Sequence, residues 1–194
     1  MRKVRIAVFA SGTGSNYEAI AKAIEAQRLD AEVVGIVSDR PEARIVETAK
    51  KHGRNLFVAT PSTYENKTEY EAEILEFLRQ HRAEFIVLAG YMRLVGPTLL
   101  QAYPRKIISI HPSLLPYYKG KDAIGQAIDA QATITGVTVH YVDEGMDTGE
   151  IIAQEGLMIH PLWKREEIET YIHRIEHQLY PETLQKIFRK LGKR

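Results

Sequence analysis

Short apolar segments alternate with segments of helical periodicity along the first 130 residues of this 194-residue chain. The apolar runs, several of them rich in β-branched residues, are residues 4–10, 31–38, 55–59, 84–89 and 106–110. Each run is followed by a segment whose apolar residues recur at helical spacing. Strands separated by helices in this way are typical of parallel sheets that are covered on both faces. The pattern predicts an α/β fold with a mainly parallel, twisted sheet, right-handed crossovers and helices on both faces.

The last third of the chain follows a different pattern. Residues 133–142 alternate in polarity, which predicts a strand with one wetter face, and residues 150–159 form another strand. We expect the two strands to pair as an antiparallel arm. Residues 163–191 are expected to form a long helix with a break where Tyr180 meets Pro181. No repeat or linker interrupts the sequence, so residues 1–194 are expected to form a single domain.

The composition excludes several classes of partner. The formal net charge is +1 and no apolar run approaches 18 residues, so we expect no nucleic-acid partner and no membrane partner. The chain has no cysteine, which excludes disulfides, thiolate metal sites and cysteine nucleophiles. The first residues lead into a strand pattern without the features of a secretory signal. We therefore expect a cytoplasmic protein that acts on small molecules, as a monomer or a homodimer.

A predicted strand at residues 106–110 ends at His111 and is followed by the rigid segment HPSLLP. Pro112 and Pro116 each fix φ and remove a backbone donor, so no regular element continues through this segment. The strand therefore presents His111 at its carboxyl end, where open α/β sheets bind ligands. On position alone, His111 is either a proton-transfer group or an ordinary loop residue.

A loop of small residues, SGTGSN at residues 11–16, separates the first strand from the first helix, whose N-cap is expected at Ser15 or Asn16. Backbone amides in such a loop approach a ligand closely, and the positive end of the helix favours an anion. The loop lacks the third glycine of a dinucleotide fingerprint and the Lys-Ser/Thr ending of a P-loop. It is either a site for a small phosphate ester or only a tight turn.

Asp147 lies in a loop bracketed by glycines, GMDTG at residues 145–149, which is flexible enough to reach the carboxyl ends of the strands. A carboxylate beside His111 would raise the pKa of the imidazole and fix its tautomer. Spacing alone does not pair the two residues, because aspartate is also common in turns of this kind.

Two further segments allow both a functional and a structural interpretation. The segment GYMRLV at residues 90–95 follows another predicted strand, and either lines a flat pocket for a ring system or forms core beneath a loop. His173, Glu176 and His177 share one face of the predicted last helix. Their order is not that of a zinc protease, so a polar helix face is favoured over a metal site.

Taken together, these segments resemble the phosphoribosylglycinamide formyltransferases, the folate-dependent enzymes of purine synthesis. The resemblance rests on SGTGSN at residues 11–16, LAGYMRLV at 88–95, IHPSLLP at 110–116, VDEGMDTGEII at 142–152 and IEHQLYP at 175–181. Their order and spacing match over nearly the whole chain. HPSLLP is shared by the wider formyltransferase superfamily, whereas the SGxGSN loop and the EHxxYP helix point to this family.

The resemblance implies a Rossmann-like formyltransferase fold and transfer of a formyl group from 10-formyltetrahydrofolate to the amine of 5-phospho-ribosyl-glycinamide. It implies three catalytic positions, namely His111, Asp147 and Ser109. The implied substrate-binding residues are Gly14, Ser15, Asn16, His173, Arg174, Ile175 and Glu176. The implied folate-binding residues are Lys67, Met92, Arg93, Leu94, Val95, Ser109, Asp143, Glu144, Gly145, Met146 and Asp147. Because the folate co-substrate supplies the reactive carbon, no metal is required.

The resemblance also implies roles for these residues. The loop at residues 14–16 would hold the substrate phosphate, and Glu176 would accept hydrogen bonds from the ribose hydroxyls. His111, as imidazolium, would stabilise the oxyanion that forms when the amine attacks the formyl carbon. Asp147 would keep the imidazolium charged and help to move a proton from the attacking nitrogen.

Ser109 departs from the family pattern, which usually has asparagine two residues before the histidine. A hydroxyl donates one hydrogen and reaches less far than an amide NH2. Three accounts fit this change: a natural variant in which serine or a bridging water donates to the oxyanion, an engineered mutant that has lost most activity, or a chain with another role. The alternatives to the formyltransferase are a formyltetrahydrofolate hydrolase, a formyltransferase for another amine, and a non-catalytic folate-binding relative.

Overall fold

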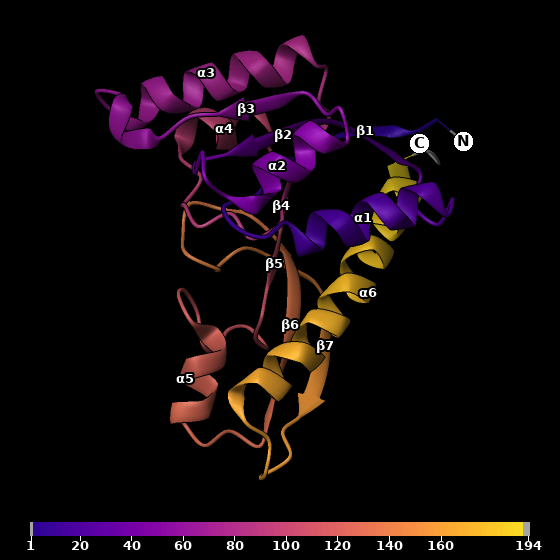
Figure 1. The fold of residues 1–194 in the computed structure, drawn as a ribbon, viewed down its shortest axis with the longest axis vertical. Coiled ribbons are helices and arrows are strands. Elements are labelled where there is room, and N and C mark those ends of the chain that lie inside the picture. The colour runs from indigo at the N-terminus through magenta and orange to yellow at the C-terminus, as the bar shows by residue number, and fades with distance from the viewer. Residues whose placement is uncertain (1, 192–194) are drawn as a thin grey trace.

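The computed structural model describes residues 2–191 and confirms the α/β architecture (Figure 1). Within this range seven strands form one sheet in the order β3-β2-β1-β4-β5-β6-β7. The strands are β1 (Val4–Phe9), β2 (Ala31–Ser38), β3 (Leu56–Val58), β4 (Phe85–Leu88), β5 (Ile107–His111), β6 (Ile134–Tyr141) and β7 (Ile151–Met158). β1 to β5 are parallel, and the predicted antiparallel arm is confirmed, since β6 is antiparallel to both β5 and β7.

The helices cover both faces of this sheet. They are α1 (Ser15–Glu25), α2 (Arg44–Lys51), α3 (Lys67–Gln80), α4 (Pro97–Ala102), α5 (Ala123–Asp129) and α6 (Arg165–Leu191), with a 3₁₀ turn, η1, at Pro61–Thr63. Alternate residues of β1 face opposite sides. Ile6 and Val8 pack in a core with α1, α2 and α6, and Ala7 and Phe9 pack in a second core with α3 and α4. None of the helices in the described part of the chain is long and apolar enough to cross a membrane.

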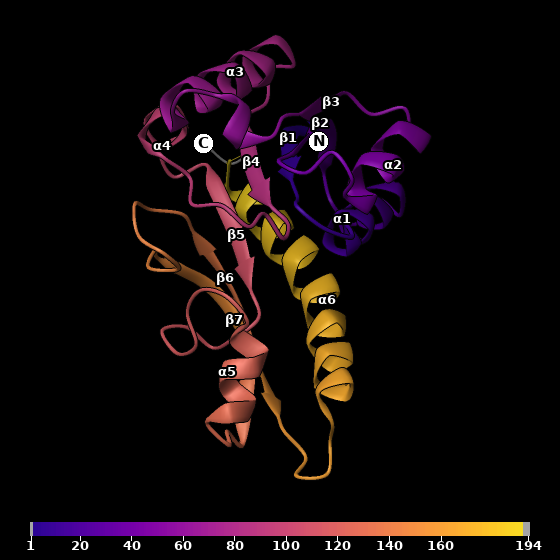
Figure 2. The same ribbon diagram turned by 60° about the vertical axis from the view of Figure 1, so that its left-hand side comes forward.

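The strand order creates a switch point between β1 and β4. From β1 the chain moves outward to β2 and β3, and it then returns to β4 and continues in the opposite direction to β5. The loops that follow β1 and β4 therefore diverge at the carboxyl edge of the sheet, and such crevices bind ligands in open α/β sheets. Figure 2 shows α6 running along the antiparallel arm and continuing past this edge to α1.

The helix break predicted at Tyr180 and Pro181 is wrong, because α6 is continuous through Pro181. Both residues are buried, and the Tyr180 hydroxyl lies 2.9 Å from the carbonyl oxygens of Leu88 and Ile108. Packing against the sheet on both sides of the proline offsets the hydrogen bond that proline removes. The segment Asp39-Arg40-Pro41 predicts the start of the second helix, but α2 begins at Arg44, because residues 39–43 form a turn.

We expect the contacts of the Tyr180 hydroxyl to contribute measurably to the free energy of unfolding. Tyr180→Phe keeps the ring and removes the only side-chain donor that residues 2–191 offer to the Leu88 and Ile108 carbonyls. We therefore expect the free energy of unfolding to fall by about 1–3 kcal/mol in urea titrations. Tyr64→Phe is the matched control, since the Tyr64 hydroxyl bonds to Glu73 at an exposed position. Equal losses from the two variants would contradict this account.

Candidate active site

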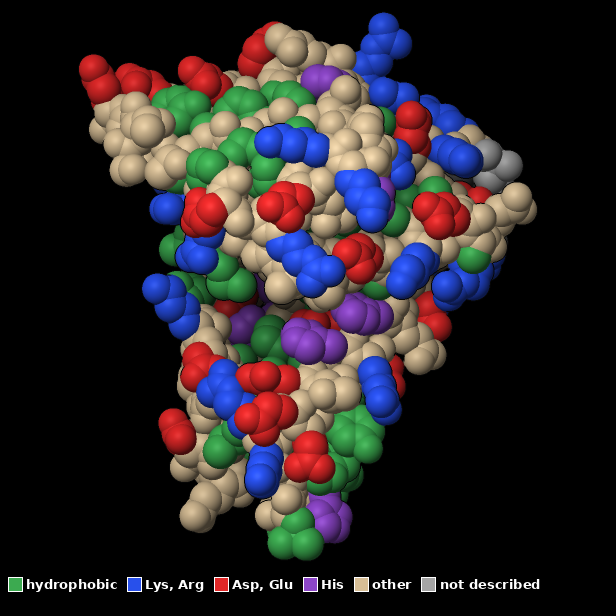
Figure 3. Space-filling model, in the orientation of Figure 1, with side chains coloured by type: hydrophobic (Ala, Val, Ile, Leu, Met, Phe, Trp, Pro, Cys, Tyr) green, Lys and Arg blue, Asp and Glu red, His purple; other side chains and the backbone are tan. Residues whose placement is uncertain are grey.

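A cavity of about 430 Å³ opens at the carboxyl edge of the sheet. Its walls come from the loops after β1, β4 and β5, from the start of α5, from the loop before β7, and from one face of α6. Figure 3 shows histidine side chains gathered around a hollow on this face of the molecule. The sequence-predicted residues that line the cavity are Gly14, Ser15, Asn16, Met92, Arg93, Leu94, Ser109, His111, Met146, Asp147, His173 and Glu176.

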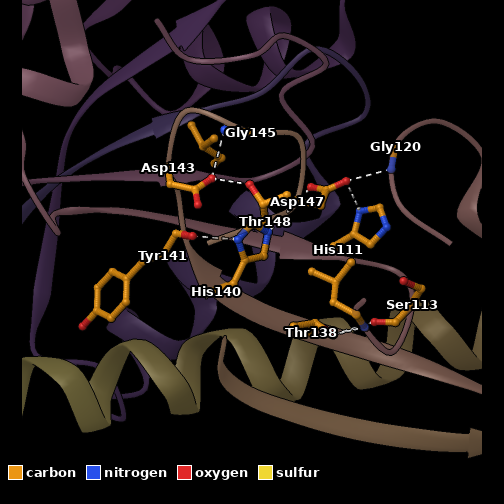
Figure 4. Close-up of polar contacts among 12 residues, drawn as sticks. His111, Ser113, Gly120, Thr138, His140, Tyr141, Asp143, Gly145, Asp147 and Thr148 are labelled. Atoms are coloured by element: carbon orange, nitrogen blue, oxygen red, sulfur yellow. Dashed lines mark hydrogen bonds and ion pairs between the residues drawn. The ribbon is translucent and has the colours of Figure 1, made fainter. Parts of the chain in front are cut away.

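His111 is the last residue of β5, and its side chain is almost fully buried. Its Nε2 lies 2.8 Å from the carbonyl oxygen of Tyr118. Its Nδ1 lies 3.4 Å from Asp147 Oδ2 (Figure 4). Both neighbouring atoms are acceptors, and only the imidazolium form donates from both ring nitrogens. The loop after His111 is held in place because the Ser113 hydroxyl donates to the Tyr117 carbonyl over 2.6 Å.

Asp147 reaches His111 from the loop between β6 and β7. This residue has a left-handed φ of 54°, which turns its carboxylate toward the cavity. Besides contacting His111, Asp147 Oδ2 accepts the backbone N–H of Gly120 over 2.8 Å. The loop that carries Asp147 is itself ordered by Asp143, which accepts from the Gly145 amide and from the Thr148 hydroxyl (Figure 4). The fold thus brings together two predicted residues that spacing could not pair.

His140 belongs to no motif in the sequence, and the sequence alone favours a structural role, so sequence reasoning misses this residue of the site. Its Nε2 lies 3.7 Å from Asp147 Oδ1 and has no hydrogen-bond partner within residues 2–191, whereas its Nδ1 lies 2.8 Å from the Tyr141 carbonyl. Burial lowers the pKa of His140, which favours the neutral ring. The register places His140 opposite Ser109 across β5 and β6. Only that strand pairing reveals its position, and the sequence does not specify it.

The loop after β1 leads into α1 without a side-chain cap, so the prediction of Ser15 or Asn16 as N-cap is wrong. Gly14 takes the N-cap position with a φ of 80°, and a Cβ there would lie 2.7 Å from Ile45 Cδ1. Only glycine fits this backbone without strain. Because no side chain among residues 2–191 caps the helix, its first amides are available to an anion.

A polar cluster on α6 faces this loop. Asn16 Nδ2 lies 3.4 Å from Glu176 Oε2, and the same carboxylate oxygen lies 2.9 Å from His173 Nδ1. The hydrogen bond to Glu176 raises the pKa of His173, whereas burial lowers the pKa of His177 on the next turn. His173 is therefore the imidazole of this pair that more readily carries a charge beside the loop. No group of three potential metal-ligating side chains is found in the described part of the chain.

The loop after β4 separates the main cavity from a second cavity of about 470 Å³. Met92, Arg93 and Leu94 line both cavities, and Lys67 at the start of α3 lines the second. Met92 and Leu94 are large apolar side chains that remain exposed, at 60% and 47%. Exposed apolar groups at the mouth of a cavity are suited to a flat ring system.

Some predicted site residues lie outside the cavities. Val95 is buried in the core beneath α3 and α4, and Ile175 packs against the other core. Arg174 lies over the ring of Tyr171 on the exposed side of α6. In the loop before β7, Asp143, Glu144 and Gly145 line neither cavity.

Comparisons with known proteins agree with this architecture. Residues 4–184 match the family model described as formyl transferase. The chain is 50% identical over 183 residues to the phosphoribosylglycinamide formyltransferase of Bacillus subtilis, a match that covers 94% of each protein. The structure is similar to phosphoribosylglycinamide formyltransferase from Bacillus halodurans, with a TM-score of 0.92, 51% identity and 94% of each chain covered.

The structure is also similar to glycinamide ribonucleotide transformylase 1 from Geobacillus kaustophilus. The TM-score is 0.93 at 51% identity, and the match covers 96% of this chain and 99% of that one. With this degree of identity along almost the entire sequence, and with the seven-stranded sheet and its C-terminal arm in common, the chain belongs to the formyl transferase family, and within it to the phosphoribosylglycinamide formyltransferases.

Proposed function

We propose that the chain transfers the formyl group of 10-formyltetrahydrofolate to the amine of 5-phospho-ribosyl-glycinamide, a reaction of purine synthesis. The observation that carries this proposal is the contact between His111 Nδ1 and Asp147 Oδ2, at 3.4 Å, in the wall of the main cavity. This cavity extends from the free amides of α1 to the apolar loop after β4. It offers one end to a phosphate and the other to a ring system, with an acid–base pair between them.

The proposed chemistry uses His111 and Asp147 on one tetrahedral intermediate. The amine nitrogen forms a bond to the formyl carbon, and the formyl oxygen becomes an oxyanion that the imidazolium of His111 stabilises. The amine then loses a proton, with Asp147 as the acceptor, directly or through water. As the bond between the formyl carbon and N10 of the folate breaks, N10 takes up a proton, so that the overall transfer conserves protons.

The two ends of the cavity suggest how the substrates lie. We place the substrate phosphate against the amides of Gly14, Ser15 and Asn16, and the ribose hydroxyls against Glu176, which is buried and aligned by His173. We place the folate ring against the loop after β4 at Met92–Leu94, and Lys67 toward the second cavity. Both placements put the reacting atoms beside His111.

The test is an assay in which formyl transfer is followed by the absorbance of the folate product. We expect turnover that requires the phosphoribosyl amine and is lost in His111→Ala. Release of formate with water as the only acceptor would favour a formyltetrahydrofolate hydrolase. Tight folate binding in calorimetry without any turnover would favour a non-catalytic relative.

The raised pKa of His173 leads us to expect that the affinity for the phosphorylated substrate depends on pH. The imidazolium is present below its pKa, and Glu176 raises that pKa above 6.5, so the cation persists to higher pH than in a free histidine. The KM for the phosphorylated substrate should be lowest below this pKa and should rise about three- to fivefold as the pH increases through it, since the charge lies at an exposed position. Initial rates measured from about pH 6 to pH 9 test this effect.

The matched control is His173→Lys, which keeps a permanent charge across this pH range. The groups around His173 that also titrate or carry charge are Glu176, Glu169 and His177 on α6, with Glu18 and Lys22 on α1 near His177. The second ionisation of the substrate phosphate, near pKa 6, affects both proteins alike. Parallel KM profiles for the two proteins would therefore rule out His173 as the source of the pH dependence.

We further propose that residues 1–194 form one domain, because both cores share the same sheet. We also predict that the protein is cytoplasmic and that it is a monomer or a homodimer. Fractionation of the source cells and light scattering of the purified protein would test them.

A further inference from the structure

A buried carboxylate lies at the carboxyl end of β2, outside the set of residues that the reaction uses directly. Asp39 follows the last residue of β2, and its side chain is 1% exposed. A carboxylate is costly to bury unless hydrogen-bonding partners compensate it. Asp39 has two partners from two other loops: the Ser11 hydroxyl donates to Oδ1 over 2.5 Å, and Arg93 Nε donates to Oδ2 over 2.8 Å.

Ser11 extends this network to the backbone of the loop after β4. Its hydroxyl accepts the N–H of Met92 over 2.9 Å, and its own N–H donates to the carbonyl of Gly90 over 3.0 Å. Gly90 has a left-handed φ of 81°, so the chain turns sharply as it leaves β4. No helix or strand fixes residues 90–93, and their shape depends on these contacts with Ser11 and Asp39.

Asp39 also determines which atoms Arg93 presents. Because Nε is engaged by the carboxylate, the guanidinium is held at one edge, and within residues 2–191 its terminal nitrogens remain available. Arg93 is 47% exposed and lines both cavities, which are separated by this loop. Asp39 therefore acts on the folate side of the cavity at two points, through the Met92 backbone and through the Arg93 side chain.

We propose that Asp39 is a positioning residue for the folate co-substrate, which it affects through Ser11 and Arg93 without touching it. The inference rests on the proposed function, because it assumes that the loop after β4 holds folate. It predicts that loss of Asp39 weakens folate selectively, while the phosphoribosyl substrate, bound by α1 and α6, is spared. A side chain with a purely structural role would affect both substrates or only the stability.

The first experiment compares Asp39→Ala and Asp39→Asn by calorimetry with 10-formyltetrahydrofolate and by steady-state kinetics. Asp39→Ala should raise the folate Kd and KM about tenfold and change the KM of the phosphoribosyl substrate less than twofold. Asp39→Asn should restore most of the affinity, because its oxygen can accept from Arg93 and its NH2 can donate to Ser11. Equal effects on the two substrates, or no rescue by asparagine, would overturn the proposal.

A control variant lies on the same strand. Asp30 immediately precedes β2 at its opposite end, where it accepts the side-chain amide of Gln185 over 2.7 Å. Asp30→Ala removes a comparable polar contact away from the cavity, and should alter the melting temperature without changing the folate KM. A folate defect in Asp30→Ala as large as that in Asp39→Ala would show that general destabilisation explains both.

The route through Arg93 is tested by a double-mutant cycle. In an Arg93→Ala background, Asp39→Ala should lower the folate affinity by at most about a further threefold. The reason is that the contact of Asp39 with Arg93 is already lost, and only its contact with Ser11 remains to be removed. If Asp39→Ala still lowered the folate affinity tenfold in this background, Asp39 would not act through Arg93. If Asp39→Ala does not fold, Ser11→Ala breaks the same network from the other side and should show the same selectivity for folate.

Failure of this inference is distinguishable from failure of the proposed function. If the unmodified chain binds folate and turns over, and the Asp39 variants behave like it, the positioning role is wrong and the function stands. If the unmodified chain neither binds 10-formyltetrahydrofolate nor transfers its formyl group, both are overturned.

Discussion

Asp147→Asn is expected to lower kcat by about 10³-fold, with little change in either KM. The substitution keeps the size of the side chain, and its oxygen can still accept from the Gly120 amide. It removes the negative charge that lies 3.4 Å from His111 Nδ1, and with it the group that accepts a proton from the amine in the proposed mechanism. The loss should therefore appear in the chemical step, which single-turnover measurements isolate from product release.

The matched control for this prediction is Asp129→Asn, which changes an exposed carboxylate at the end of α5 and should leave kcat unchanged. A double variant sharpens the test. If His111 and Asp147 act as one unit, Asp147→Asn should cost little more in a His111→Ala background. Additive losses would show that the two residues serve separate steps. An Asp147→Asn enzyme with near-normal kcat would remove Asp147 from the mechanism.

The sequence predicted the parts of this site that follow directly from strand order. The loops at residues 11–16 and 90–95 follow parallel strands, and His111 ends one. The carboxyl ends of such strands meet at one edge of the sheet. The resemblance added roles to these loops. Asp147 is different, because its position depends on an antiparallel arm that folds back along β5.

Other features of the fold and the site depend on tertiary contacts and could not be predicted from the sequence. His140 lies at the site only because the register sets it opposite Ser109, and a shift of one residue would turn it to the other face. Pro181 stays inside α6 because neighbouring Tyr180 is anchored on β4 and β5, a contact between residues about 70 to 90 positions apart. The contacts of Asp39, and so its proposed role, depend on the meeting of three loops, which no local pattern indicates.

Ser109→Asn is expected to raise kcat by about tenfold to a hundredfold. Ser109 lies two residues before His111 on β5, so the two side chains share the face of the strand that lines the cavity. An amide at this position reaches further than a hydroxyl and donates from its NH2, which would add a donor to the oxyanion beside the imidazolium. Ser109 is only half-buried, and the longer side chain can extend into the cavity.

Two companion variants separate the donor from the volume of the side chain. Ser109→Leu has nearly the shape of asparagine without its amide, so it should not reproduce the gain if hydrogen bonding causes it. Ser109→Ala tests whether the present hydroxyl already donates to the oxyanion, directly or through water. A kcat below that of the unmodified chain would show that it does. An unchanged kcat would show that His111 acts on the oxyanion without Ser109. If Ser109→Asn leaves kcat unchanged or lowers it, the serine is not what limits this enzyme, and the network of His111, Asp147 and His140 has adapted to work with a hydroxyl beside it.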